Sequence, residues 1–312
     1  MNYDCEITVI VCTYNPNLTK LISTLKSVVL QKGVKTQIIV TDDGSKESYC
    51  NEVNAFFSMY PEIEYELIEN DRNIGTVNNI YNAIQLAKGK YTYVISPGDY
   101  FFSENTLSQI LLFSEENDIE IAFGKAQYYK YENNSMKLFC RMNPCAPVIY
   151  NLRWLSKKMK TLAYCTTQGI VGASFFRRTD VFTEYLSKII GRSKYDEDNA
   201  TSYIHVLQKS KSIYYLDKFV VWYEYGTGIS TSNNKKFLEE LEKDCTTVLN
   251  DIRDRSNRSV IDYMLEKNKT TCFFKHPIIF FKILFLRIIG ELFRYKNFMN
   301  SSNSFFDEIT NS

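Results

Sequence analysis

Three short segments of the 312-residue chain place carboxylates where a bound ligand could meet them. Asp42 and Asp43 follow one strand-like run, and Asp99 follows another. Asp196-Glu197-Asp198 opens a segment with helical spacing. A carboxylate in such a place can accept hydrogen bonds from ligand hydroxyls, hold a hard cation, or take a proton from an attacking hydroxyl. These segments are therefore the first candidates for a reaction site.

Each segment also has an ordinary structural interpretation. Asp42-Asp43-Gly44-Ser45 contains a D-G pair, and such pairs form turns freely. Pro97-Gly98 suits the two central positions of a type I or type II turn. Acidic side chains at a helix start cap the helix or complement its dipole. Because each motif alone allows both interpretations, their positions relative to one another decide between them.

The elements that must position these segments alternate along the first part of the chain. β-Branched and apolar runs predict strands, and apolar residues at helical spacing predict the helices between them. This alternation is typical of an α/β fold with a doubly wound, Rossmann-like and mostly parallel sheet flanked by helices. The predicted strands are residues 7–12, 37–41, 64–69 and 91–96, and the predicted helices are residues 18–30, 49–59 and 75–87.

Polar residues follow three of these strands. They are Thr13-Tyr14-Asn15, Asp42-Asp43, and Ser96 to Asp99. In an open α/β sheet, ligands bind beyond the carboxyl ends of the strands. We therefore expect the three segments to meet at one edge of the sheet, where they would form a single site.

The later part of the chain has a different pattern. Residues 131–168 are rich in loops and aromatic side chains, and the chain from about residue 233 is mainly helical. Between about residues 105 and 230, the spacing predicts several more elements of the same layered fold. These are a helix at 107–116, strands at 119–129, 174–178 and 213–225, and helices from 179 and at 198–209.

The composition excludes several classes of protein. The formal charge of +1 argues against a nucleic-acid partner, and 45% hydrophobic residues predict a packed core. The eight Cys form no C-x-x-C pair and only two His are present, which argues against a structural zinc site. The N-terminus resembles a strand rather than a signal peptide, and no apolar run of about 18 residues occurs, so we expect a cytoplasmic chain without a spanning helix. The sequence leaves the oligomeric state open.

A stretch near the C-terminus, residues 277–293, is rich in Ile, Phe and Leu. On a helix, Arg287, Glu291 and Arg294 would share one face, and Lys275, Lys282 and Lys296 would add positive charge at the ends. One interpretation is a helix that lies on an anionic membrane surface. The other is a core helix that closes the domain. An amphipathic pattern does not separate the two.

Four stretches together resemble the family 2 glycosyltransferases of the bacterial polysaccharide type, which have the GT-A fold. They are ITVIVCTYNP, QIIVTDDGSKES, NIGTVNNIYNAIQLAKGKYTYVISPGDYF, and YDED with SFFRR before it. The resemblance covers roughly residues 5–230 and implies a GT-A domain at 1–230. Its nucleotide-sugar-binding half would be 1–104 and its acceptor half 105–230. A helical C-terminal region would follow at 231–312, and membrane association is one of the two interpretations of this region given above.

The resemblance implies a nucleotide-sugar donor, with UDP as the expected nucleotide. The short carboxylate of Asp43 would accept hydrogen bonds from the ribose or the base. Thr13 and Tyr14 would support the base, and the turn after the fourth strand would lie at the diphosphate. The residues expected to bind the donor are Thr13, Tyr14, Asn15, Asp43, Gly75, Asn78, Pro97, Gly98 and Asp99.

The family usually holds a divalent cation, Mg²⁺ or Mn²⁺, through an acid-x-acid motif after the fourth strand. Here the motif is Ser96-Pro97-Gly98-Asp99, so Asp99 is its only carboxylate and the only motif residue expected to bind the metal. The loop at 223–230, which carries a metal-binding His in many members, has no His. Either water and phosphate complete the shell of a cation on Asp99, or Asp99 contacts the sugar and other groups bind the diphosphate. The basic residues considered for that role are Arg72, Lys88, Lys90 and Lys125.

The resemblance places the catalytic acids at Asp196-Glu197-Asp198. An inverting transfer needs one carboxylate that takes the proton of the acceptor hydroxyl. We expect Asp198 to be this general base and Glu197 to lie on the acceptor side, although three consecutive acids leave Asp196 and Glu197 open as alternatives. A retaining mechanism would need a second, nucleophilic carboxylate near the donor, and no motif supplies one.

The leading hypothesis is therefore an inverting hexosyltransferase. It would move a sugar from a nucleotide-sugar donor to a glycan or lipid-linked acceptor in cell-surface polysaccharide synthesis, at the inner face of the plasma membrane. The alternative is a non-catalytic or metal-independent sugar-nucleotide-binding relative that acts as a scaffold. The missing acids at Ser96 and Gly98 motivate this alternative.

Overall fold

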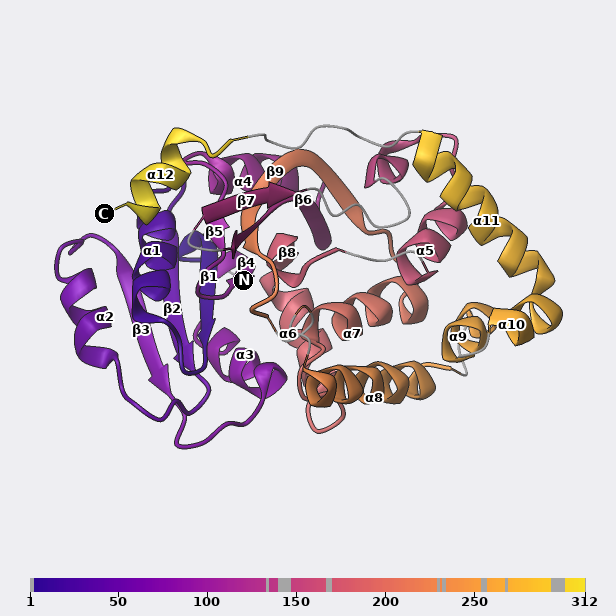
Figure 1. Cartoon of the computed structure of the whole chain (residues 1–312), viewed down its shortest axis with the longest axis horizontal. Helices are drawn as coiled ribbons and strands as arrows, with labels where there is room; N and C mark the ends of the chain where they lie inside the picture. Colours follow the sequence, from indigo (N-terminus) through magenta and orange to yellow (C-terminus); the bar gives the residue numbers. More distant parts are fainter. Residues whose placement is uncertain are drawn as a thin grey trace.

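The first four strands form a parallel sheet in the order β3-β2-β1-β4. The computed structural model describes residues 3–132, 135–139, 147–166, 170–228, 231, 234–253, 257–266, 269–292 and 301–311 (Figure 1). Strands and helices alternate here as predicted. The strands are β1 (Cys5–Thr13), β2 (Thr36–Asp42), β3 (Glu64–Glu69) and β4 (Gly89–Ile95), and the helices are α1 (Leu18–Val29), α2 (Cys50–Phe57) and α3 (Thr76–Ile84).

The later strands extend this sheet rather than forming a second one. Strand β8 pairs with β4 in antiparallel fashion, β6 pairs with β8, and β9 runs parallel to β6. In the part of the chain that the structure describes, the result is one nine-stranded sheet, ordered β3-β2-β1-β4-β8-β6-β9-β5 with β7 beside β6. The added strands are β5 (Tyr100–Phe101), β6 (Ile121–Glu132), β7 (Ser135–Phe139), β8 (Phe175–Arg178) and β9 (Tyr214–Glu224).

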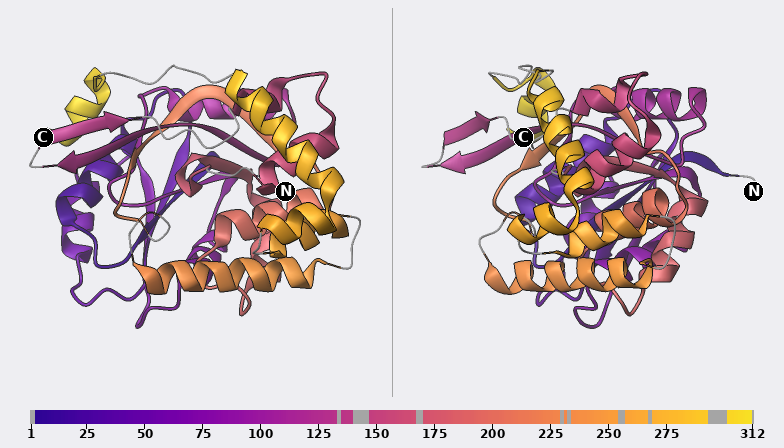
Figure 2. Two further views of the ribbon diagram at one scale, coloured as in Figure 1. Left: turned by 45° about the vertical axis from the view of Figure 1, so that its right-hand side comes forward. Right: turned by 90° about the vertical axis from the view of Figure 1, so that its right-hand side faces the viewer.

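Helices cover both faces of the sheet because its strands are apolar on both sides. Val9 and Val40 point into one core with α1, α2 and α4, whereas Ile10 and Ile39 point into the other with α3, α6, α7 and α8. Successive side chains of a strand alternate between faces, so continuous apolar runs require two covering layers. Figure 2 shows how the helices are arranged around the sheet in two further views. The helices not yet given are α4 (Thr106–Glu116), α5 (Lys157–Thr166), α6 (Thr179–Ile189), α7 (Glu197–Tyr203) and α8 (Lys235–Asp251).

The structure differs from the sequence prediction in two places. Residues 131–168 were expected to be loop-rich, but they contain β7 and α5. Helix α5 has few apolar residues in its first turn, and its Leu162 and Ala163 are buried against the C-terminal helices. The helix predicted at 198–209 ends as α7 at Tyr203 and continues as a π-helical turn at Ile204–Gln208. The burial of α5 depends on contacts with residues far away in the chain.

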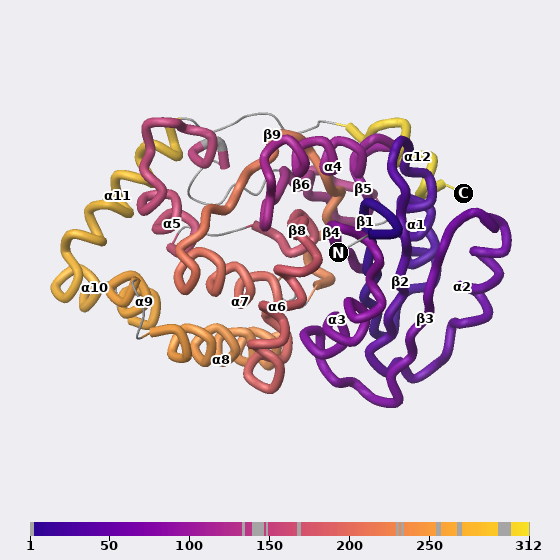
Figure 3. The backbone as a smooth tube through the Cα atoms, turned by 180° about the vertical axis from the view of Figure 1, so that it is seen from behind, coloured from indigo at the N-terminus to yellow at the C-terminus, as the bar shows by residue number. Residues whose placement is uncertain are grey.

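The C-terminal region returns to the first half of the chain. Phe305, Phe306 and Ile309 of α12 pack with Tyr100 and Trp222. Figures 1 and 3 show α12 beside α1 from opposite sides. None of the described helices is long and apolar enough to cross a membrane. The region consists of α8, α9 (Arg258–Leu265), α10 (Lys269–Lys275), α11 (Pro277–Leu292) and α12 (Ser304–Thr310), while Phe293, Arg294 and Lys296 lie outside the described residues.

Candidate active site

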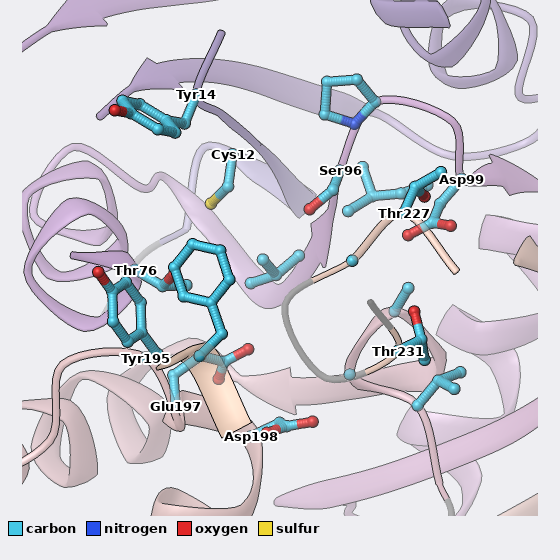
Figure 4. A pocket seen from close by; sticks show the side chains of 18 of the residues that line it. Cys12, Tyr14, Thr76, Ser96, Asp99, Tyr195, Glu197, Asp198, Thr227 and Thr231 are labelled. Atoms are coloured by element: carbon cyan, nitrogen blue, oxygen red, sulfur yellow. The ribbon is translucent and has the colours of Figure 1, made fainter. Parts of the chain in front are cut away.

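The predicted strand ends meet in one cleft of about 1130 Å³. Figure 4 shows Tyr14, Ser96 and Asp99 on one side of this cleft, with Tyr195, Glu197 and Asp198 on the other. The expected convergence at the carboxyl edge of the sheet is therefore confirmed. The predicted residues that line the cleft are Thr13, Tyr14, Asn15, Asp43, Pro97, Asp99, Asp196, Glu197 and Asp198. Gly75, Asn78 and Gly98 are not among the lining residues.

The loop after β1 is tied to the loop after β2. The backbone N–H of Asn15 donates to Ser45 Oγ at 2.6 Å, and Asn15 Oδ1 accepts from the N–H of Lys46 at 3.0 Å. Asn15 has a left-handed backbone (φ 45°), which Asn tolerates better than most residues. Thr13 is buried and hydrogen-bonds the Tyr49 hydroxyl. Tyr14 is left half exposed over the cleft, where an aromatic face can contact a flat ligand group.

Asp43 binds backbone groups of the protein itself. Its Oδ1 accepts from the N–H of Ile74 at 2.6 Å, and its Oδ2 accepts from the N–H of Gly75 at 3.1 Å. Burial raises the pKa of Asp43, while these two backbone hydrogen bonds oppose the rise. Gly75 has φ +89°, and a Cβ there would meet Lys194 Cγ at 2.5 Å, so glycine is required. Asp43 and Gly75 thus set the position of the α3 N-terminus beside the cleft.

Residues of α1 and β9 hold the turn after β4 in place. Thr24 of α1 donates to the Asp99 carbonyl at 2.9 Å and accepts from the Gly98 N–H at 3.2 Å. Asp99 is buried, and its Oδ1 accepts from the N–H of Glu224 at 3.0 Å. Burial raises the pKa of Asp99 well above its ordinary value. The carboxylate predicted to meet the donor therefore also fixes the end of β9.

Sequence reasoning missed the other charged groups at this turn. Lys20 Nζ lies 2.5 Å from Glu224 Oε1 and 2.7 Å from Glu224 Oε2, and both residues line the cleft. These two residues are 204 positions apart, so no local pattern could have paired them. Of the basic residues considered before, Lys88, Lys90 and Lys125 form ion pairs with Glu64, Glu115 and Asp217, and none of the four lines the cleft.

These residues offer few free carboxylate oxygens to the divalent cation that the family resemblance implies. An Mg²⁺ or Mn²⁺ site needs carboxylate oxygens that face the ion. Asp99 directs one oxygen to a backbone N–H, and both oxygens of Glu224 accept from an ammonium group. Within the described ranges, no group of three or more His, Cys, Asp or Glu side chains could hold a metal ion.

The three consecutive acids lie at the start of α7, where α8 holds them. Asp244 of α8 is buried, and its Oδ2 accepts from the N–H groups of Lys194 at 2.8 Å and Tyr195 at 2.7 Å. Asp196 is buried and accepts from Asn199 Nδ2 at 2.8 Å. Helix α8 also lines the cleft directly, through Phe237, Leu241, Glu242 and Cys245. The C-terminal region thus completes the site, which no local signal indicated.

Asp198 is the member of the trio best placed for chemistry. It is half-buried at the cleft surface, and its Oδ1 accepts from the N–H of Asn199 at 2.8 Å. Its Oδ2 lies 3.0 Å from the point that a Cβ on Gly172 would occupy. Glycine at 172 therefore leaves room for one orientation of this carboxylate. Asp198 remains partly open to a ligand, whereas Asp196 is buried.

Glu197 is buried behind Asp198 and faces Arg177. Arg177 Nη2 lies 3.3 Å from Glu197 Oε2, and the guanidinium group of Arg177 lies over the rings of Phe175 and Phe182. Neither Glu197 Oε2 nor the guanidinium nitrogens hydrogen-bond any of the described residues. Burial raises the pKa of Glu197 to about 7, although Arg177 opposes this rise.

Because the pKa of Glu197 is raised, we expect the free energy of unfolding to fall as pH rises. Glu197 binds its proton more tightly in the folded protein, where its pKa is about 7, than in the unfolded chain, where it is 4.5. The contribution of Glu197 to the free energy of unfolding is complete below the pKa of the unfolded chain. It is lost as pH rises through the pKa of the folded protein. Relative to Glu197→Gln, we expect the wild type to lose about 2–3 kcal/mol of unfolding free energy between pH 5 and pH 8.

Urea denaturation of both proteins across this range measures the difference. Glutamine has nearly the same size as glutamate. Asp196 is present in both proteins, so the contribution of Asp196 to the pH dependence largely cancels in the difference between them. Two stability curves that run parallel from pH 5 to pH 8 would contradict the raised pKa of Glu197.

Comparisons with known proteins agree with this geometry. Residues 8–186 match the sequence model of Glycosyl transferase family 2. An uncharacterized glycosyltransferase, the MG025 homolog of Mycoplasma pneumoniae, is 27% identical over 235 residues, which cover 74% of this chain and 72% of that protein. The mannosyltransferase PcManGT from Pyrobaculum calidifontis, solved with GDP-Man and Mn²⁺, aligns with a TM-score of 0.59 at 13% identity, covering 94% of this chain and 82% of that one.

TarS of S. aureus has a similar fold. Its residues 1–349, solved with UDP-GlcNAc, align with a TM-score of 0.57 at 17% identity, covering 87% of this chain and 73% of that one. The chain spans only 45% of a longer TarS structure, with a TM-score of 0.55, 16% identity and 86% of this chain covered. At these identities, the solved structures show a shared GT-A fold and nothing finer.

Proposed function

Because the family match covers more than half of the sequence, the chain belongs to glycosyltransferase family 2, and from this premise we propose the reaction that it performs. The protein transfers a hexose from a nucleotide-sugar donor, UDP-linked, to a glycan or lipid-linked acceptor in cell-surface polysaccharide synthesis. One observation carries the proposal. The cleft brings the donor-side residues Tyr14, Asp43 and Pro97 together with Asp198 on its other side.

The proposed chemistry is a single inverting displacement. The acceptor hydroxyl oxygen forms a bond to the anomeric carbon of the sugar as the bond from that carbon to the donor phosphate breaks. Asp198 takes the hydroxyl proton, and the electron pair of the broken bond stays on the departing nucleoside diphosphate. Asp196 and Glu197 are less exposed to the cleft than Asp198, which supports the choice of Asp198 as the base.

Nucleotide-sugar binding tests this function directly. The solved neighbours that hold UDP-GlcNAc and GDP-Man motivate a panel of UDP-, GDP-, dTDP- and CDP-sugars. We expect one donor to raise the thermal midpoint, since a ligand bound only to the folded state stabilises it by mass action. Slow donor hydrolysis in the same samples would support catalysis. Binding without hydrolysis or transfer would favour the scaffold alternative, and no binding by any donor would contradict the proposal.

We also propose that α11 binds an anionic membrane surface. Ile283, Leu286 and Ile289 of α11 are buried against α5, so one face of the helix belongs to the core. Another face is apolar and exposed: Phe281 is 57% exposed and Leu292 is 77% exposed. The other large exposed side chains of this surface are Phe274, Ile278, Leu284, Phe285 and Ile288.

Positive charge borders this apolar surface. Lys282 and Arg287 are exposed on α11, on either side of the apolar stripe at helical spacing, and the exposed Glu291 lies one turn after Arg287. Apolar side chains between basic residues are the pattern of a helix that lies in the lipid interface. A lipid-linked acceptor would be held in the same plane. Binding at the cytoplasmic face of the membrane is part of this proposal and would place the protein beside a lipid-linked acceptor.

A further inference from the structure

The described residues that line the cleft include one basic side chain and many acidic ones. Of the described residues that line it, Lys20 alone carries positive charge, whereas seven are acidic. These are Asp43, Asp99, Asp196, Glu197, Asp198, Glu224 and Glu242. A nucleoside diphosphate is a strong anion and needs a positive partner, above all as it departs. This imbalance singles out Lys20.

We infer that the ammonium group of Lys20 binds the donor diphosphate in place of a divalent cation, so that donor binding and transfer proceed without metal. This inference rests on the proposed function and names the group that receives the leaving diphosphate. When the bond between sugar and phosphate breaks, its electron pair remains on a phosphate oxygen. Lys20 Nζ stabilises that charge through hydrogen bonds and its own positive charge.

The first observation is the position of Lys20. It lies in the first turn of α1, where Asn17 caps its backbone N–H at 3.1 Å. A lysine there opposes the helix dipole, since positive charge is favoured at the other end. Asn17 and Lys20 both line the cleft, so the N-terminal end of α1 faces it. A side chain in an unfavourable local position needs a compensating interaction elsewhere. The ion pair with Glu224 compensates for the unfavourable position of Lys20.

The second observation is how Glu224 holds Lys20. The Glu224 side chain is 5% exposed, and the Lys20 side chain is 31% exposed. An ammonium group has three N–H donors, and the two Glu224 oxygens accept from it at 2.5 and 2.7 Å. At least one donor is thus left for a phosphate oxygen. The buried partner restrains the ammonium group while its exposed side remains open to the cleft.

The third observation concerns the altered motif. Gly98 occupies an acidic position of the acid-x-acid pattern, and its φ is +98°. A Cβ at Gly98 would lie 2.4 Å from Glu224 Oε2. The Glu224 carboxylate therefore fills the space beside the turn that a side chain at 98 would need. The glycine at position 98, where the family pattern has an acid, therefore makes room for the carboxylate that pairs with Lys20.

Nucleotide binding by the 312-residue chain tests the inference. Affinities for UDP and UMP, or for GDP and GMP if guanine is the base, are measured by calorimetry in EDTA and in Mn²⁺. We expect wild-type affinity for the diphosphate to be the same in both. Lys20→Met should weaken diphosphate binding at least about tenfold, the usual scale for a hydrogen bond to a charged group. Monophosphate binding should change little, and Lys20→Arg should keep most of the diphosphate affinity.

Two further variants separate binding from folding. Lys20→Met/Glu224→Met removes both charges, so no buried carboxylate is left without its partner. This double variant should bind the diphosphate as weakly as Lys20→Met does, and more weakly than the wild type. Lys90→Met breaks the exposed pair with Glu115, outside the cleft, and should behave as wild type. Wild-type binding that is lost in EDTA, with Lys20→Met unchanged in Mn²⁺, would overturn the inference. Failure of UDP, GDP, ADP, CDP and dTDP to bind at all would instead contradict the proposed function.

Discussion

Replacing Asp198 with Asn should lower kcat by about 10²–10⁴-fold and leave donor affinity unchanged. An amide cannot take the proton of the attacking hydroxyl, and general-base catalysis contributes on that scale. Asp198 is the least buried acid of the trio, and it lies on the opposite side of the cleft from the donor residues. Initial rates under saturating donor and acceptor, together with the thermal shift caused by donor, measure the two effects.

A matched control tests whether the effect comes from the helix terminus instead. Asp180 also lies in the first turn of a helix, α6, and its Oδ1 accepts from the N–H of Val181 at 2.7 Å, as Asp198 accepts from Asn199. Asp180 does not line the cleft. Asp180→Asn should therefore keep full activity. Undiminished turnover in Asp198→Asn would remove it as the base and direct attention to Glu197→Gln.

The triple variant Phe281→Ser/Phe285→Ser/Ile288→Ser should release the protein from anionic membranes. Each of these side chains is exposed in the protein and would be buried in the lipid interface. Burying a large apolar side chain stabilises by about 1.5–3 kcal/mol, so losing three should weaken binding at least about a hundredfold. Sedimentation with vesicles of phosphatidylcholine and phosphatidylglycerol measures the affinity. Added salt should weaken wild-type binding by screening Lys282 and Arg287.

Substitutions test this surface better than a deletion does. Removing residues from Pro277 onward would also remove Ile283 and Leu286 from the core, and α12 from its contacts with Trp222. As a control, Met59→Ser/Leu86→Ser/Leu112→Ser changes exposed apolar residues elsewhere, and it should still bind vesicles. Equal binding by both triple variants would show that α11 is not the membrane surface. Both should unfold within about 1 kcal/mol of wild type, because the replaced side chains are exposed.

The donor side of the site could be predicted from the sequence. Thr13, Asp43 and Asp99 each follow a strand whose apolar run is visible in the sequence. Parallel strands joined by helices bring such ends to one edge of a sheet. The order of the elements therefore predicts that these three residues lie at the same edge of the sheet. The structure confirms that they line one cleft.

The acceptor side could be predicted less well. The acidic trio was recognised by resemblance, but the partners that give its members different environments were not. Asp244 accepts from the backbone N–H of Asp196, the first residue of the trio, from 48 positions away, and Arg177 faces Glu197 from another element. The apolar surface of α11 was left open between core and membrane, and the structure shows that Ile283 and Phe281 lie on different faces.

The sequence by itself determined the parallel half of the sheet and the carboxylates at its edge. Strand alternation, helical spacing and turn residues are local, so they can be read without knowing the fold. Only the tertiary structure decided which charges meet there. Lys20 and Glu224 form an ion pair because β9 returns beside the turn after β4, close to Gly98. Charge pairing depends on distance in space, and chain folding creates that proximity between residues 204 positions apart.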